Sequence, residues 1–520
     1  MTPGPPAQVV IGLDVGTTGV KAAAFGLGSS WRSVAIREYP LLQPTPGQKV
    51  QDPATILTAS GDALAECVAT AGSAEVLAVS VSAGMHGLMA LDGELGPLTH
   101  LITWADARAR EEARSLRRSG RAAELHALTG VPVHPMTPLT KLMWLARHDP
   151  RTWASARWWV GLKDYILLWL TGTLVTELSS ASGTGLLDMS TRTWSATAIE
   201  LCGLDADRLP PILPTTTTLG LAPAAARTVG LRAGTPVVVG AADGPLGNLG
   251  SGAVSPGIAG LSLGTSGAVR MAVNEPQVDA GRTLFCYALT DAAWVVGGAI
   301  SNGGVVLRWT GQSLAPDVQP TAGHQRADAA LLKLAASVPA GSEGLVMLPY
   351  LLAERAPLWD PDLPGAYLGL RLEHTRAHLI RAAVEGVCLQ MRLILDRLDD
   401  VESVSSVRVT GGVFRSALWR EVMAAMLARP IHVVGAAEGT ALGAAALGLF
   451  ALDRAPTPTD AVTKLSEAEA PPPETVAPDR QLMDTYDQLR ASVPELIGAL
   501  DGVAGLFTHA SDAEAGVRSP

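Results

Sequence analysis

The chain has 520 residues, of which 48% are hydrophobic, so it exceeds what one hydrophobic core supports and predicts two large folded domains. Its formal net charge of −10 argues against a surface for the nucleic-acid backbone, and we expect no nucleic-acid partner. The four cysteines lack CxxC spacing, which argues against a zinc site, and the absence of a leader pattern or a membrane-length apolar run predicts a cytoplasmic protein with no membrane partner.

Strands alternate with helices through the first half of the chain, which indicates an α/β layer architecture. The runs QVVIGLDV and VKAAAFGL flank a tight turn and predict a hairpin. The next predicted elements are helices at about 54–71 and 106–128, with the strand VLAVSVS (76–82) between them. We expect a disordered N-terminus over residues 1–8 and a first domain over residues 9–250.

The alternation starts afresh near residue 235, with the strands TPVVVGAAD and GIAGLSLGTSG. The later predicted elements are a long helix at about 374–398, the strand SVRVTGG, the helix SALWREVMAAMLA, the strand IHVVG and the helix TALGAAALGLFAL. We expect these to form a second domain over residues 251–453. Residues 454–520 become rich in Pro, Glu and Thr, which predicts a mobile connection, one amphipathic helix near 480–500 and a frayed tail.

One short phrase occurs twice, as GLDVGTTGVK at residues 12–21 and as GLSLGTSGAV at residues 260–269. A turn of glycines and hydroxyls between two strands presents backbone N–H groups and hydroxyls that can cradle phosphate oxygens. A single copy is readily explained as an ordinary hairpin turn. Two copies at equivalent places in two domains favour a pair of turns that grip one nucleotide polyphosphate. A P-loop is excluded, because no G-x-x-x-x-G-K-[ST] occurs.

Two aspartates are candidates for the charged groups that phosphoryl transfer requires. Asp14 in the first copy is replaced by Ser262 in the second, so we expect the first copy to lie at the metal side, because Mg²⁺ prefers carboxylate oxygens. Asp243 follows an apolar strand and precedes a helix of small residues, which places its carboxylate at a sheet edge. It is a candidate general base for phosphoryl transfer, and a simple helix cap is the alternative.

These motifs resemble those of the FGGY family of carbohydrate kinases, over about residues 9–452. The matching phrases are, in the order of the family, LDVGTTGVK, GMHG, TWADAR, GAADGPLGNLGSG, SLGTSGAVR, AERAPLWDPDLPGAYLGL and VTGGVFRSALWREVMA. Within the family the chain is most similar to gluconokinases, through TGVPVHPMTPLTKLMWL, SSASGTGLLDM and Gly244. The phrase MHG at residues 85–87 departs from that likeness and is of the xylulokinase type.

The resemblance implies a fold of two actin-like (ribonuclease H-like) domains with an active-site cleft between them, and ATP and Mg²⁺ as cofactors. It implies phosphorylation of a sugar or sugar acid at its terminal hydroxyl, most readily D-gluconate to 6-phospho-D-gluconate. Xylulose or another sugar of the family is the first alternative. A non-catalytic, actin-like nucleotide-dependent binding protein is the second. The sequence is also compatible with a homodimer.

The resemblance also implies roles for individual residues. Asp243 is the expected general base, and Asp14 and Asp243 are the expected metal ligands. The residues expected at the nucleotide are Thr17, Thr18, Lys21, Gly264, Thr265, Gly304, Gly412 and Ser416. The residues expected at the sugar, besides Asp243, are Met85, His86, Trp104 and Asp106.

Two further features bear on the substrate and on domain motion. A gluconate carboxylate needs a cation or a donor cluster, for which Lys163 and Arg355 are candidates, with ordinary surface charges as the other interpretation. Residues 245–260 are rich in Gly and Ser and are the expected hinge for closure of the cleft around bound sugar.

Overall fold

The computed structural model describes residues 6–318, 324–352, 354–435, 439–466 and 473–515. The expected disordered N-terminus lies outside the described residues for residues 1–5, and the first strand begins at Gln8. Within the described part of the chain, no helix is both long and apolar enough to cross a membrane.

The first lobe is built on a six-stranded sheet. Its strands are, in spatial order, β13 (Thr218–Gly220), β14 (Pro236–Val238), β5 (Glu75–Ala83), β1 (Gln8–Val15), β2 (Gly19–Gly26) and β3 (Arg32–Glu38). The helices α1 (Pro53–Ala71), α6 (Leu162–Thr171) and α9 (Pro223–Val229) pack on one face of this sheet through an apolar core.

The second lobe is built on a seven-stranded sheet. Its strands are, in spatial order, β17 (Phe285–Thr290), β18 (Ala293–Ile300), β16 (Gly267–Val273), β15 (Ile258–Leu263), β21 (Ser406–Thr410), β22 (Ile431–Val433) and β23 (Glu474–Val476). Its principal helices are α11 (Gly304–Leu314), α12 (His324–Ala335), α13 (Arg376–Val401) and α14 (Ala417–Leu427). The buried face of α13 lies at the centre of the core of this lobe.

The two sheets share one order of strands. In each, a hairpin (β1–β2 and β15–β16) is extended by an antiparallel strand on one side and by two parallel strands on the other. The repeated phrases form these two hairpins, as predicted. Because the order recurs in both lobes, the fold is the expected pair of actin-like α/β domains.

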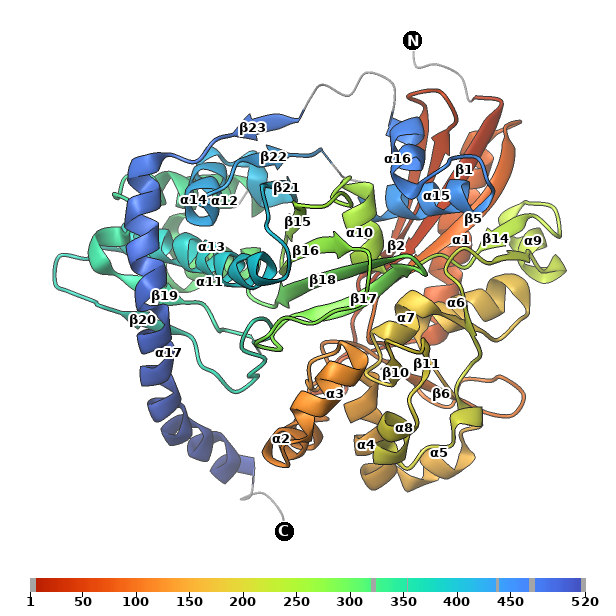
Figure 1. Cartoon of the computed structure of the whole chain (residues 1–520), viewed down its shortest axis with the longest axis horizontal. Coiled ribbons are helices and arrows are strands. Elements are labelled where there is room, and N and C mark those ends of the chain that lie inside the picture. Colours follow the sequence, from red (N-terminus) through yellow and green to blue (C-terminus); the bar gives the residue numbers. More distant parts are fainter. Residues whose placement is uncertain (1–5, 319–323, 353, 436–438, 467–472, 516–520) are drawn as a thin grey trace.

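Two helices of small residues, α10 (Asp243–Gly250) and α15 (Gly439–Ala451), pack against each other between the sheets (Figure 1). A Cβ atom at Gly250 would lie 1.7 Å from the carbonyl oxygen of Gly439, and one at Gly12 would lie 1.9 Å from that of Ala441. The glycines of residues 245–250 therefore permit close backbone packing inside a helix. The hinge was expected over residues 245–260. Because residues 245–250 belong to a packed helix and β15 begins at Ile258, only the loop at residues 251–257 remains a candidate hinge.

A helical region is inserted in the first lobe below its sheet (Figure 1). Its helices are α2 (Arg110–Arg118), α3 (Arg121–Thr129), α4 (Pro138–His148), α5 (Pro150–Ser155), α7 (Leu178–Ser182) and α8 (Ala196–Cys202). The single helical pattern predicted over residues 106–128 forms two helices, because Gly120 between them adopts a left-handed conformation with φ of 78°.

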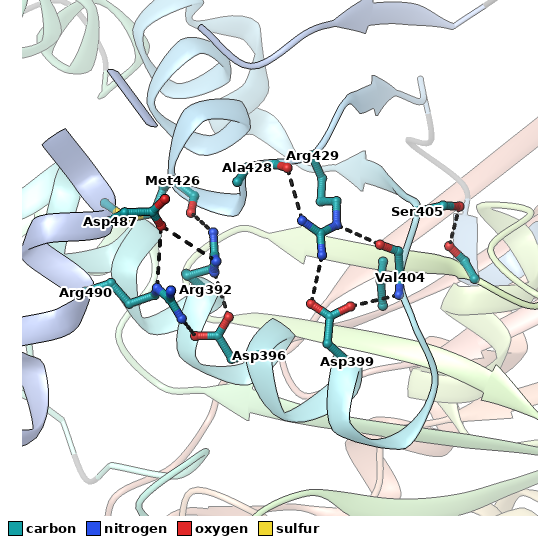
Figure 2. Close-up of polar contacts among 11 residues, drawn as sticks. Arg392, Asp396, Asp399, Val404, Ser405, Met426, Ala428, Arg429, Asp487 and Arg490 are labelled. Carbon is teal, nitrogen blue, oxygen red and sulfur yellow. Dashed lines mark hydrogen bonds and ion pairs between the residues drawn. The ribbon is translucent and has the colours of Figure 1, made fainter. Parts of the chain in front are cut away.

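The C-terminal segment is more regular than its composition predicts. Part of the expected mobile connection forms the helix α16 (Pro458–Ser466), which packs on α15, while β23 joins the edge of the second sheet. The final helix, α17, runs from Arg480 to Ala515 and is longer than predicted. Arg490 of α17 and Arg392 of α13 share Asp396 and Asp487, which anchors α17 to the second lobe (Figure 2).

Candidate active site

A cavity of about 270 Å³ opens between the two lobes at the place where the hairpins meet. The first lobe contributes Asp14 and Lys21, α10 contributes Asp243, and the second lobe contributes Ser262 and Arg270. The residues that distinguish the two copies of the repeat, Asp14 and Ser262, therefore face the same space. Charged and polar groups of both lobes converge there, as binding of a polyphosphate requires.

Asp14 lies on β1, directly opposite Lys21 in the hairpin. Its Oδ1 accepts a hydrogen bond of 2.9 Å from the hydroxyl of Ser82 on β5. Burial, together with the nearby Asp243 carboxylate, raises the pKa of Asp14 to about 6. The two carboxylates thus repel each other across the cavity.

Asp243 is the first residue of α10, and its Oδ1 accepts a hydrogen bond of 2.7 Å from the N–H of Gly244. Burial raises the pKa of this carboxylate, and the guanidinium of Arg270 opposes the rise. The chain reaches this position through Gly240, whose φ of 74° and approach to Val81 leave no room for a side chain.

The carboxylates fit a magnesium ion bound largely by phosphate and water. The described residues include no cluster of three or more His, Cys, Asp or Glu that could hold a metal alone. Mg²⁺ commonly uses only one or two carboxylates and completes its octahedron with phosphate oxygens and water. Asp14 and Asp243 match that donor set, and Lys21 and Arg270 are nearby cations that partly offset their charge.

The second turn is an exposed backbone cradle. The N–H of Gly304, at the start of α11, donates to the carbonyl of Gly264 at 2.7 Å, and the N–H of Gly303 donates to that of Thr265. Gly411 passes so close to Leu263 that a Cβ atom would lie 2.0 Å from its carbonyl oxygen. The structure therefore brings together Gly264, Thr265, Gly304 and Gly412, four residues expected at the nucleotide, and Ser416 follows them at the N-cap of α14.

In the first turn, the two threonines expected at the nucleotide, Thr17 and Thr18, have different surroundings. The hydroxyl of Thr17 accepts a hydrogen bond of 2.9 Å from the indole of Trp104, and its carbonyl accepts one of 2.6 Å from Gln51. Thr17 lines a small hollow together with Met85 and Trp104, whereas Thr18 is exposed. The turn thus joins the expected phosphate region to the expected sugar region.

On the side where the sugar is expected, His86 has a left-handed backbone (φ of 64°) and a neutral ring. Its Nδ1 donates to the carbonyl of Gly183 at 2.8 Å, so Nε2 is the acceptor and faces the hydroxyl of Tyr287 at 3.4 Å. Burial, reinforced by Lys141, lowers the pKa of His86 to about 3. The buried Arg355 lies with its guanidinium carbon 4.8 Å from the ring centroid of Trp104.

Two candidate residues have structural partners instead of facing the cavity. The carboxylate of Asp106 accepts hydrogen bonds from the backbone N–H of Lys49 and from the guanidinium of Arg108, and it lines a separate hollow from that of Trp104. Lys163 is buried, and its Nζ donates to the carbonyls of Val81, Val239 and Ala241 at 2.6–3.1 Å. An ammonium has three protons, so none remains for a substrate.

Sequence reasoning missed Arg270 and Tyr287. Arg270 ends the quoted phrase SLGTSGAVR, but a cation on a strand carries no local signal of its role. Tyr287 stacks on Phe285 with centroids 4.2 Å apart and reaches His86 from the other lobe. Both positions depend on strand register across the cleft.

Two actin-like lobes, a glycine-rich backbone turn and a pair of carboxylates in the intervening cavity are the arrangement expected of an ATP-dependent phosphotransferase. Two models of the FGGY family of carbohydrate kinases match the chain, the N-terminal domain at residues 9–250 and the C-terminal domain at residues 259–452. The chain belongs to the FGGY family of carbohydrate kinases, and it is an ATP-dependent sugar kinase of that family.

Named relatives show how far the likeness extends. The chain is 34% identical to a gluconokinase of Bacillus subtilis (strain 168) over 96% of this chain and 99% of that protein. It is 29% identical to a xylulose kinase of the same organism, over 85% of this chain and 88% of that protein. The crystal structure of gluconate kinase from Lactobacillus acidophilus superposes with a TM-score of 0.89 at 30% identity, over 96% of this chain and 99% of that one.

Proposed function

We propose that this kinase transfers the γ-phosphoryl group of ATP to the terminal hydroxyl of D-gluconate, giving 6-phospho-D-gluconate and ADP. The observation that carries the proposal is Arg355. Its Nε and Nη2 donate to the hydroxyl of Ser301 and the carbonyl of Ile300, whereas no described residue accepts from Nη1. A buried cation on the face of Trp104, at the sugar side of the cleft, suits a substrate that carries a carboxylate. The similarity to gluconokinases supports the same assignment.

In this proposal Asp243 accepts the proton of the attacking hydroxyl. Burial raises the pKa of Asp243, which makes its carboxylate a better base than an exposed aspartate. Asp14 and Asp243 would hold Mg²⁺, which when bound supplies charge neutralisation at the phosphate oxygens. The cradle of Gly264, Thr265 and Gly304 would fix the polyphosphate, and His86, as a neutral acceptor, would bind a sugar hydroxyl.

The substrate is tested by ADP release over a panel of D-gluconate, D-xylulose and glycerol. We expect the highest kcat/KM for gluconate. A higher value for xylulose would overturn the gluconate assignment and leave the kinase class intact.

The role of Arg355 is tested with gluconate and its neutral amide, gluconamide. The parent enzyme should prefer gluconate, and Arg355→Met should reduce that preference by about 10–100-fold, because one charge-assisted hydrogen bond is lost. A merely structural role for Arg355 would lower turnover of both substrates equally and leave their ratio unchanged.

A further inference from the structure

Arg270 reaches the cavity from β16 but has almost no protein partner there. Its Nη1 lies 3.5 Å from the hydroxyl of Ser262, and its Nε is buried without a hydrogen-bond partner among the described residues. Arg270 forms no ion pair within 4.0 Å in the part of the chain that the structure describes. A buried donor left unbonded is unfavourable, so this arrangement favours the binding of an anion.

The register of the two hairpins explains why the cation lies where it does. In the first hairpin, Asp14 is directly opposite Lys21, so the carboxylate and the cation face each other across the strands. In the second hairpin, Ser262 is opposite Ala268. Arg270 lies two residues further along β16, opposite Gly260. Residues two apart share a face of a strand, so Arg270 is on the cavity face with Ser262. The second hairpin therefore presents a cation without an acidic partner of its own.

Arg270 also lies against the start of α10. A Cβ atom at Gly244 would be 3.3 Å from Nε of Arg270, which places the guanidinium next to the turn that carries Asp243. Arg355, by contrast, stacks on Trp104 at the sugar side. Both arginines lower the pKa of the Asp243 carboxylate, Arg270 more than Arg355, and Arg270 is the one beside the turn that carries the expected base.

We propose that Arg270 is a catalytic residue whose guanidinium binds the non-bridging oxygens of the γ-phosphoryl group during transfer. The proposal rests on the ATP-dependent reaction and on the position of Asp243, not on the identity of the sugar. The acceptor oxygen bonds to phosphorus as its proton passes to Asp243, and the bond to the bridging oxygen of ADP breaks with its electron pair leaving on ADP. Arg270 exchanges no proton and supplies two directed hydrogen bonds to charge that spreads over the equatorial oxygens.

The test compares Arg270→Gln and Arg270→Lys with the parent chain in magnesium buffer. We expect kcat to fall about 10²–10³-fold in Arg270→Gln, whichever sugar the enzyme uses, with ADP affinity within threefold of the parent. The affinity for ADP with aluminium fluoride, which mimics the transferring phosphoryl group, should fall in parallel with kcat. Arg270→Lys should recover only part of both, because a lysine lacks the planar fork.

Arg429→Gln provides the matched control. Arg429 is also partly buried in the second lobe, where it donates to Asp399 and to the carbonyl of Val404 (Figure 2). It is not among the residues that line the cavity. This variant should lose stability and keep kcat and fluoride-complex affinity within twofold. Three outcomes would overturn the proposal: a change in kcat below threefold in Arg270→Gln, equal losses of affinity for ADP and for its fluoride complex, or a loss confined to the preference for gluconate over gluconamide.

Discussion

Buried charged groups around the cleft differ in how completely protein partners satisfy them. At the expected sugar end, Lys163 donates all three protons of its ammonium to backbone carbonyls, and Asp106 accepts hydrogen bonds from Arg108 and the backbone of Lys49. At the expected phosphate end, Asp14 accepts a hydrogen bond from the hydroxyl of Ser82, and the hydroxyl of Ser262, at 3.5 Å, is the one hydrogen-bond partner of Arg270 among the described residues. Full sets of partners assign Lys163 and Asp106 to the scaffold. Asp14, Arg270 and, beside Trp104, Arg355 keep polar atoms that a ligand can bond.

This difference has an energetic meaning. A buried charge with protein partners stabilises a local geometry, and removing one member leaves the other uncompensated. A buried charge without partners costs folding stability and becomes favourable only when ligand charge completes it. The same substitution should therefore affect stability at one end of the cleft and catalysis at the other.

The largest effect is expected for Asp243→Asn. An amide cannot take the proton of the attacking hydroxyl, so kcat should fall about 10³–10⁴-fold, and ATP affinity should change little. Steady-state ADP release and calorimetric titration with a nonhydrolysable ATP analogue measure the two quantities. A loss of less than tenfold in kcat would remove Asp243 from the role of base.

Lys163→Met should act mainly on stability. Lys163 and Glu177 form a buried pair at 3.6 Å, and Glu177 in turn caps α7, where the hydroxyl of Ser179 accepts from the N–H of Ala242. Breaking such a pair should lower the free energy of unfolding by about 3–5 kcal/mol, measured by urea denaturation. Because this network supports the chain just before Asp243, kcat should fall more than KM rises.

The double variant Lys163→Met, Glu177→Gln is the control for that effect. Removing both charges should recover part of the lost stability, since the single variant suffers from the stranded Glu177 carboxylate. Strictly additive losses in the two single variants would contradict the pairing.

Asp14→Asn should lower activity and raise stability. Burial and Asp243 lift the pKa of Asp14 from 3.8 to about 6, so the ionised carboxylate is disfavoured in the folded state, and the penalty is largest above pH 6 and absent well below pH 4. Removing the charge should stabilise the ligand-free protein by up to about 3 kcal/mol at pH 8 and by less at pH 5. Thermal melts at both pH values, with kcat expected to fall about 100-fold, check the prediction.

A matched measurement with Mg²⁺ and ADP sharpens this prediction. If Asp14 supports the metal, ligand should stabilise the parent more than Asp14→Asn, and the advantage of the variant should shrink or reverse. An advantage that is equal at pH 5 and pH 8 would show that the charge of Asp14 is not its cause.

Features of the cleft could be predicted where neighbouring residues encode them, and were missed where they depend on contacts between distant parts of the chain. The paired turns and the strand end before Asp243 were predicted, because glycines, hydroxyls and apolar runs act on their immediate neighbours. The partners of Lys163 lie on β5 and just beyond the end of β14, about 80 residues before and after it in the chain. The place of Arg270 depends on its register with Gly260. Neither feature leaves a local pattern, which is why Lys163 resembled a ligand and Arg270 was missed.

The smallest catalytic effect is expected for Asp106→Asn, a residue that the family resemblance implies at the sugar. Because its carboxylate already bonds Arg108 and the backbone of Lys49, the variant should lose about 1–3 kcal/mol of stability and keep kcat/KM within threefold.

Trp104→Phe is the contrasting change, since it removes the indole donor to Thr17 and alters the face on which Arg355 stacks. That variant should raise KM for the sugar several-fold with little loss of stability. If Asp106→Asn instead raises KM as Trp104→Phe does, Asp106 contacts the substrate, and the division between scaffold and ligand site fails at the sugar end.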